Sequence, residues 1–272
     1  MTRPGVSAEA VPAARRIGRV NWIGLWTLFW RDVLRDLDIW KITVAAPALN
    51  SLLFALIFKL ALGDASVTMG GLDFAAFLAP GLVAYALLER GFEATAYSLV
   101  YDKLERMIED VVTAPLTAAE TAVGYGLSAA SVSMVTGTAA WLALLPFLQS
   151  VPAAPAALVV FAFAGGLMMG LLGVIGGLWA YKWDHISAVQ TFVVVPALFM
   201  SGVFFSLDRL PEQFHLLAAL NPLYYAIDGM RYGLTGRAGV DPAAGLAVVA
   251  AVDAVLWFAC WRLFAGGYKL KT

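Results

Sequence analysis

The sequence has little cysteine, histidine or charge, and each shortage excludes a class of protein. A single cysteine, Cys260, rules out a disulfide within the chain and any zinc site built from several cysteines. Charged residues make up 14% of the 272 positions, against roughly 25% in soluble domains. The formal net charge is −1 without a basic block, which excludes the usual signature of nucleic-acid binding.

Catalytic motifs are also missing. The chain has no GxxxxGK[ST] loop, so we expect it to bind no ATP of its own, and it has neither HExxH nor GxSxG. The two histidines, His185 and His215, are expected on opposite sides of a membrane and cannot share a metal ion. We therefore predict no catalytic, metal or cofactor-binding residues in this chain, and no enzyme activity.

Apolar residues are abundant instead. They make up 61% of the chain, and the mean hydropathy is +0.79. A chain of this size cannot bury so much apolar surface in one or two soluble cores. The composition predicts an integral membrane protein.

Six runs are long enough to cross a bilayer, which takes about 20 mostly apolar residues. The predicted fold is an all-α membrane domain over 41–265, with spans at about 42–62, 74–97, 121–148, 156–181, 186–206 and 242–264. Prolines at Pro152 and Pro155 divide the uncharged run 121–181 into two helices, and Asp241-Pro242 is typical of a helix start. With the N-terminus inside, 13 of the 18 lysines and arginines fall in cytosolic segments, so we expect both termini in the cytosol.

The segment before the first span predicts an amphipathic helix over 21–40, after a polar cytosolic tail at 1–20; a second short tail covers 266–272. Its apolar stripe consists of Trp22, Trp26, Phe29, Val33, Leu37 and Trp40. Tryptophan favours the headgroup region, so we expect the helix to lie in the cytosolic leaflet. A passive anchor and a mechanical lever both fit this pattern.

The loop after the second span is acidic. Leu104, Met107, Ile108 and Val111 form a short apolar face, and Asp102, Glu105, Glu109 and Asp110 charge the other side, opposed by Lys103 and Arg106. An acidic amphipathic helix gains nothing from an anionic membrane surface and suits docking on another protein. A solvated turn between two spans is the alternative.

A few charges lie within the spans. Glu89 and Glu93 share one helix face near the cytosolic boundary, and Arg90 can pair with Glu93. They either reach cytosolic water or line a pathway. Asp253 is roughly 16 Å into its helix and should face protein or water. Lys59 can extend outward or pair with Asp253.

Small residues recur on the fourth span. Gly166, Gly170, Gly173 and Gly177 form a stripe that predicts close packing of helices inside the bundle.

Four segments in order resemble the ABC-2 type permease family, the membrane subunits of ATP-driven exporters, over roughly residues 20–265. They are Phe77–Leu82, Glu109 through Pro115-Leu116, Pro196–Phe205 with Leu210-Pro211, and Asn221–Tyr225 with Asp228–Gly233. The segments resemble those of bacterial drug-type and nodulation-factor-type export permeases. Secondary transporters and intramembrane enzymes remain the competing classes.

The resemblance implies a permease of the bacterial inner membrane that works as a dimer, expected to be a homodimer, with a separate ATPase that holds ATP and Mg. The residues expected to couple to that ATPase are Asp102, Leu104, Glu105, Met107, Ile108, Glu109, Val112 and Pro115. A re-entrant external gate is expected at Leu210, Pro211, Asn221, Pro222, Tyr224 and Tyr225. Candidate pathway residues, which no family pattern supplies, are Glu89, Glu93 and Asp253.

Overall fold

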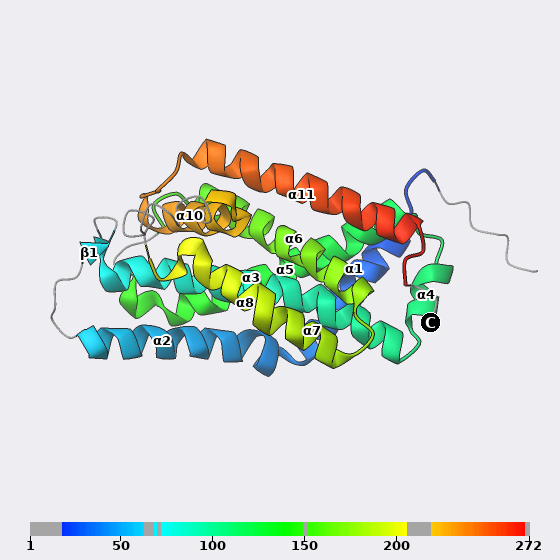
Figure 1. The fold of residues 1–272 in the computed structure, drawn as a ribbon, viewed down its shortest axis with the longest axis horizontal. Helices are drawn as coiled ribbons and strands as arrows, with labels where there is room; N and C mark the ends of the chain where they lie inside the picture. The colour runs from blue at the N-terminus through cyan, green and yellow to red at the C-terminus, as the bar shows by residue number, and fades with distance from the viewer. Residues whose placement is uncertain (1–17, 63–67, 70–71, 149–151, 206–218, 270–272) are drawn as a thin grey trace, which may run out of the picture.

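The computed structural model describes residues 18–62, 68–69, 72–148, 152–205 and 219–269. Its regular elements are helical, apart from a short antiparallel pair formed by β1 (Thr68–Met69) and β2 (Leu72–Asp73). The long helices run side by side along the long axis of the molecule (Figure 1). The predicted all-α class is confirmed.

The described helices follow one another in this order: α1 (Trp22–Asp38), η1 (Lys41–Ala45), α2 (Ala46–Leu62), α3 (Phe74–Leu104), α4 (Ile108–Thr113), α5 (Ala118–Ala143), η2 (Leu145–Phe147), α6 (Pro155–Trp179), α7 (Trp183–Val189), η3 (Gln190–Val194), α8 (Val195–Leu198), η4 (Phe199–Val203), α10 (Pro222–Thr235) and α11 (Pro242–Ala265). The elements η1, η3 and η4 are π-helical, and α7 through η4 form one segment that kinks at Ser201 and Gly202, where the backbone angles are not helical.

Helix ends follow local sequence signals. Thr117 and Glu120 make a reciprocal capping box at the start of α5. The Asp241 side chain accepts a hydrogen bond from Ala243 N at 2.8 Å, and Pro242 occupies the first turn of α11. The predicted helix start at Asp241-Pro242 is confirmed.

Four described segments are long and apolar enough to cross a membrane: Lys41–Ala61, Pro155–Trp179, Trp183–Val203 and Pro242–Ala265. Two more, α3 and α5, have 31 and 26 residues and occupy the ranges of the second and third predicted spans, but they are less apolar and lie deep in the bundle. Helix α3 continues past the predicted end at residue 97 to Leu104, because the side chains of Asp102 and Lys103 are buried against other helices rather than solvated.

The centre of the molecule is formed by α3, α5 and α6, with α2, α10, α11 and the α7–η4 segment packed around them. The glycine stripe of α6 faces α3 and α5. A Cβ atom on Gly177 would lie 2.9 Å from the carbonyl oxygen of Ala96, and Thr95 donates a hydrogen bond to the carbonyl of Gly170 at 2.6 Å. The predicted packing role of this stripe is confirmed.

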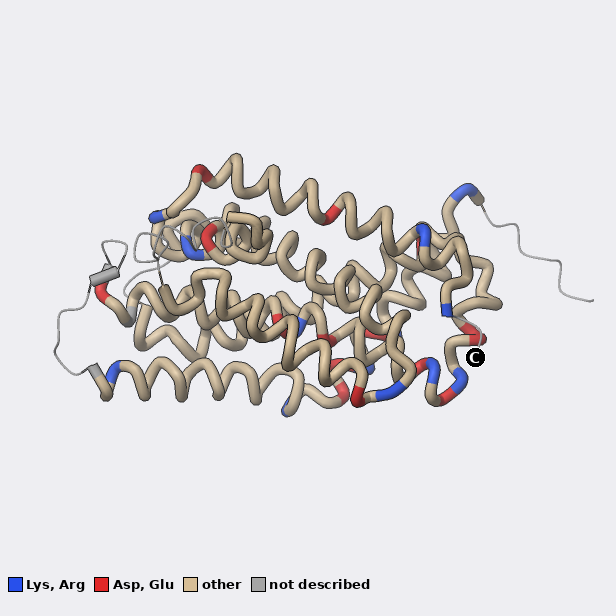
Figure 2. Tube along the Cα trace, viewed as in Figure 1, with Lys and Arg blue, Asp and Glu red and all other residues tan. Residues whose placement is uncertain are grey.

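The two ends of the bundle differ. The first described residues, α4 and the C-terminal end lie together at one end, whereas β1 and α10 lie at the other (Figure 1). Charged residues gather at the end that holds α1 and α4, and uncharged residues dominate the length between the ends (Figure 2). The described chain therefore begins and finishes at its more highly charged end.

Candidate functional site

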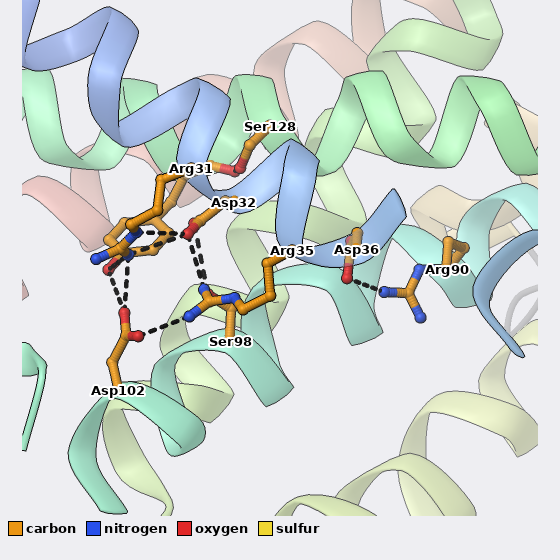
Figure 3. A network of polar contacts seen from close by, with 9 residues as sticks. Arg31, Asp32, Arg35, Asp36, Arg90, Ser98, Asp102 and Ser128 are labelled. Atoms are coloured by element: carbon orange, nitrogen blue, oxygen red, sulfur yellow. Dashed lines mark hydrogen bonds and ion pairs between the residues drawn. The ribbon is translucent and has the colours of Figure 1, made fainter. Parts of the chain in front are cut away.

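The charged face of α1 points into the protein. Arg31 binds Asp102 of α3 at 2.8 Å, and Arg35 binds the other oxygen of Asp102 at 2.7 Å. Asp32 lies between the two arginines, 3.0 Å from Arg31 and 2.7 Å from Arg35 (Figure 3). The side chain of Asp102 is 0% exposed. We call Arg31, Asp32, Arg35 and Asp102 the α1–α3 clamp.

The clamp is balanced in charge and saturated with hydrogen bonds. Two guanidinium groups face two carboxylates, Tyr125 of α5 donates to Asp102 at 3.2 Å, and Arg35 also contacts Ser98. The tryptophans of α1 lie outside this cluster, with Trp22 69% exposed. The clamp was not predicted from the sequence, because the apolar stripe of this helix does not show which residues its charged face meets, and the burial of Asp102 is visible only in the fold.

A second charged cluster joins α1 to the middle of α3. Arg90 binds Asp36 of α1 at 2.6 Å and Glu93 at 3.1 Å. Gln190 of η3 contacts Glu93 and donates to Glu89 at 3.4 Å. The predicted Arg90–Glu93 pair is confirmed, whereas the link to Asp36 was not foreseen.

The segment after α3 divides the predicted coupling residues into two groups. Leu104, Glu105, Met107, Glu109, Val112 and Pro115 are exposed. Asp102 and Ile108 are buried, so they cannot contact a partner in this arrangement; Asp102 holds the clamp, and Ile108 packs beside Tyr125 and Leu99 in the core. The predicted four-residue apolar face is wrong in this respect, because Ile108 and Val111 turn inward while Leu104 and Met107 face outward. We call the six exposed residues the α4 face.

Helix α1 contacts this segment at its far end too. The backbone N–H of Asn21 donates to Glu120 at 2.7 Å, and the Asn21 side chain donates to the carbonyl of Pro115 at 3.0 Å. Hydrogen bonds from Thr117 and Asn21 hold the pKa of Glu120 below its usual value. Glu120 is thus a capping residue that joins α1 to α5.

Lys103 is also misplaced by the sequence reading, which counted it as a solvated charge opposing the acids. It is buried, and its ammonium group donates to the carbonyls of Gly177, Leu178 and Ala180 at 2.9, 2.5 and 3.1 Å. These carbonyls belong to the C-terminal end of α6, where unpaired carbonyls favour a cation. Lys103 therefore fastens α3 to α6 beside the α4 face.

A groove of about 380 Å³ opens between α2, α3 and η4. Its polar lining residues are Glu89, Arg90, Glu93, Asn50 and Ser51. Its aromatic lining residues are Tyr85, Phe54, Phe199 and Phe204. Two of the three predicted pathway residues therefore share one cavity.

The third, Asp253, lies elsewhere. It belongs to α11, on the side of the bundle opposite α2 (Figure 1), is 9% exposed, and its Oδ1 has no hydrogen-bond partner among the described residues. Lys59 of α2 instead lies over the ring of Phe147, 5.4 Å from its centroid. The alternative pairing of Lys59 with Asp253 is wrong, because the two helices lie on opposite sides of the core.

The predicted gate is described in part, since Leu210 and Pro211 lie outside the described residues. Asn221 caps α10 and its side-chain nitrogen donates to Ser201 at 2.7 Å, Pro222 occupies the first turn, and Tyr224 is buried next to Tyr225. The carbonyl of Gly202, a residue with a φ of 78°, accepts a hydrogen bond from Arg231 at 2.7 Å. Hydrogen bonds from Asn221 and Arg231 thus hold α10 against the end of the preceding helical segment.

Comparison with known families decides what kind of protein carries this arrangement. The family model described as ABC-2 type transporter matches residues 24–235, from α1 to the end of α10. The chain belongs to this family. Its resemblance to ABC-2 permeases, inferred from four sequence segments, is confirmed.

Individual ABC-2 relatives match over most of their length. The inner membrane transport permease YadH of Escherichia coli K12 is 29% identical over 255 residues, which cover 92% of this chain and 98% of the relative. Nodulation protein J of Rhizobium leguminosarum bv. trifolii is 30% identical over 257 residues, with 87% of this chain and 88% of the relative covered. Nodulation protein J of Sinorhizobium fredii NGR234 is 31% identical over 228 residues, with coverage of 80% and 83%.

Membership of the ABC-2 family indicates what kind of protein contains the clamp, the α4 face and the groove. This ABC-2 chain is a membrane transporter subunit, and the family consists of transport permeases that normally work with an ATPase subunit. The matched range contains the clamp, the α4 face and the groove. All three therefore belong to the transporter domain.

Proposed function

We propose that this chain is the membrane-spanning permease of an ATP-driven exporter, with the α4 face as the surface that binds a separate ATPase. The exposed α4 face, fastened to α1 on both sides, is the observation that carries the proposal. Before it, the clamp holds Asp102, and after it, Asn21 holds Pro115 and Glu120. A short segment held on both sides in this way can transmit a displacement imposed by a partner instead of deforming.

This displacement is transmitted along α3. Because α3 is one continuous helix of 31 residues, a displacement at Leu104 moves the turn that carries Glu89 and Glu93. The clamp and the Asp36–Arg90 pair make α1 move with α3. The groove at Glu89 and Glu93 is the segment of the export path that we assign to this chain.

Six spans complete the proposed topology: the segment 41–62, α3, α5, α6, the segment 183–203 and α11. An even number of spans agrees with the described chain ends lying at one end of the bundle (Figure 1). We place that end in the cytosol of a bacterial cell, with the chain in the inner membrane and α1 in the cytosolic leaflet as a lever. Helix α10, with Asn221 at its start, belongs to the external re-entrant gate, and two copies of the chain build the working unit.

Purification of the tagged chain from its native membrane in a mild detergent, followed by mass spectrometry, tests this function. We expect a stoichiometric P-loop ATPase, which carries ATP and Mg, and we expect the double change Glu105→Lys with Glu109→Lys to remove it. The change Asp184→Lys, at another exposed acid, is the matched control and should retain it. Absence of an ATPase in several mild detergents would overturn the proposal in favour of ion-coupled transport.

Asp253 is tested separately, because it does not line the groove. If it faces the export path, Asp253→Asn should leave expression intact and reduce export. Export at the level of the unmodified chain would assign Asp253 to packing between α11 and its neighbours.

A further inference from the structure

The groove between α2, α3 and η4 is lined by both aromatic and charged side chains. Tyr85 stacks on Phe199 with ring centroids 5.5 Å apart, and Phe204 continues the row at 5.3 Å from Phe199 and 6.5 Å from Phe54. Glu89, Arg90 and Glu93 form the charged lining on the same stretch of α3 as Tyr85. A cavity lined by an aromatic row and by charged residues fits an amphiphilic ligand better than a wholly apolar one.

The charged lining carries an excess of acid. Both terminal nitrogens of Arg90 are engaged, one with Asp36 and the other with Glu93. One guanidinium group therefore faces two carboxylates, and Glu89 adds a third that forms no ion pair among the described residues. Burying unbalanced carboxylates is unfavourable, so a cation that enters the groove is stabilised there.

One further observation points to a cationic ligand. The faces of aromatic rings attract cations, and the row from Tyr85 to Phe54 offers such faces next to the acids.

We propose that the groove binds a cationic amphiphile, with its positively charged group beside Glu89 and Glu93 and its apolar body on the aromatic row. The ligand class follows from the excess of carboxylates and from the rings, and an anionic amphiphile is excluded by the same charges. This inference rests on the proposed function only in treating the groove as part of the export path.

Two ions of nearly the same shape and opposite charge test it. The full-length chain in nanodiscs of neutral lipid is titrated with tetraphenylphosphonium and with tetraphenylborate, and binding to empty nanodiscs is subtracted. We expect saturable binding of tetraphenylphosphonium alone. Glu89→Gln should weaken that binding about tenfold, the effect of losing one favourable charge contact, whereas Asp184→Asn, a change outside the groove, should leave it unaltered.

Binding of tetraphenylborate as tight as that of tetraphenylphosphonium would overturn the inference, as would unchanged binding in a folded Glu89→Gln variant. If that variant does not fold, the comparison of the two ions on the unmodified chain still tests the inference. Phe199→Ala provides a second variant, which should weaken the binding of tetraphenylphosphonium. The outcome is independent of ATPase recruitment. If the chain recruits the ATPase but prefers tetraphenylborate, only this inference fails. If the chain binds tetraphenylphosphonium but recruits no ATPase, the exporter assignment fails.

Discussion

The two charged clusters that join α1 to α3 are built from the same residue types and differ in their balance. In the clamp, Arg31 and Arg35 face Asp32 and Asp102, and the carboxylate of Asp102 is fully buried. In the groove cluster, Arg90 alone faces Asp36 and Glu93, with Glu89 beside them. The first cluster is closed and neutral, and the second is acidic and borders a cavity.

This difference separates a structural role from a functional one. A buried ion cluster in which every charge has an opposite partner holds helices in one arrangement. Removing one partner leaves the opposite charge uncompensated. An unbalanced cluster beside a cavity is stabilised by a ligand of the opposite charge. Changes in the clamp should therefore reduce stability, whereas changes at Glu89 should mainly affect binding.

The largest effect is expected from Asp102→Ala. It leaves Arg31 and Arg35 with Asp32 as their common partner, and losing one member of a buried ion cluster typically costs about 3–5 kcal/mol. We expect the lower end of this range, because both arginines are partly exposed. Denaturant unfolding in mixed micelles measures it, with Asp38→Ala, at an exposed acid of α1, as the control. Equal stability of the two variants would show that the clamp does not hold α1.

A smaller and asymmetric effect is expected in the groove cluster. Arg90→Met removes the cation from Asp36 and Glu93 and should destabilise the chain by about 2 kcal/mol. Glu89→Gln removes a carboxylate without an ion pair and should change stability by less than about 1 kcal/mol. The same unfolding assay compares them. A larger loss for Glu89→Gln than for Arg90→Met would contradict the assignment of Glu89 to ligand binding.

The smallest effect is expected from Glu120→Gln, which weakens the capping box and the contact to Asn21 by about 1 kcal/mol. Because the folded chain lowers the pKa of Glu120, this stabilisation is complete above the ordinary pKa of a glutamate and is lost as the pH falls through the lowered pKa. Unfolding measured at pH 7 and at acid pH should therefore show a smaller pH dependence in the variant. An unchanged pH dependence would assign the acid sensitivity to other carboxylates.

Much of the fold could be predicted because it depends on local patterns. The apolar runs gave the helix positions, Asp241-Pro242 gave a helix start, and the glycines of α6 gave its packing face. Each of these signals lies within one segment of about 20 residues. None requires knowledge of which helix is the neighbour.

The candidate site was harder to predict because its key contacts join residues far apart in the sequence. Asp102 and Lys103 look like charges of a solvated loop until the helices that bury them, α1 and α6, are in place. Ile108 fits an exposed apolar face by its spacing but turns toward the core beside Leu99. Hydrophobic periodicity places a residue on a helix face, and only tertiary packing decides whether that face meets water or protein.

The most direct test of the account is cross-linking from the α4 face in native membranes. Because Cys260, the chain's own cysteine, is buried, Met107→Cys introduces an exposed thiol. Leu60→Cys provides an exposed control in the last turn of α2, a helix that ends far from α4 (Figure 1). A bifunctional thiol–amine reagent and mass spectrometry then identify the neighbour. The account predicts a P-loop ATPase joined to the Met107→Cys chain and not to the Leu60→Cys chain. Efficient labelling at position 107 without an ATPase adduct would contradict it.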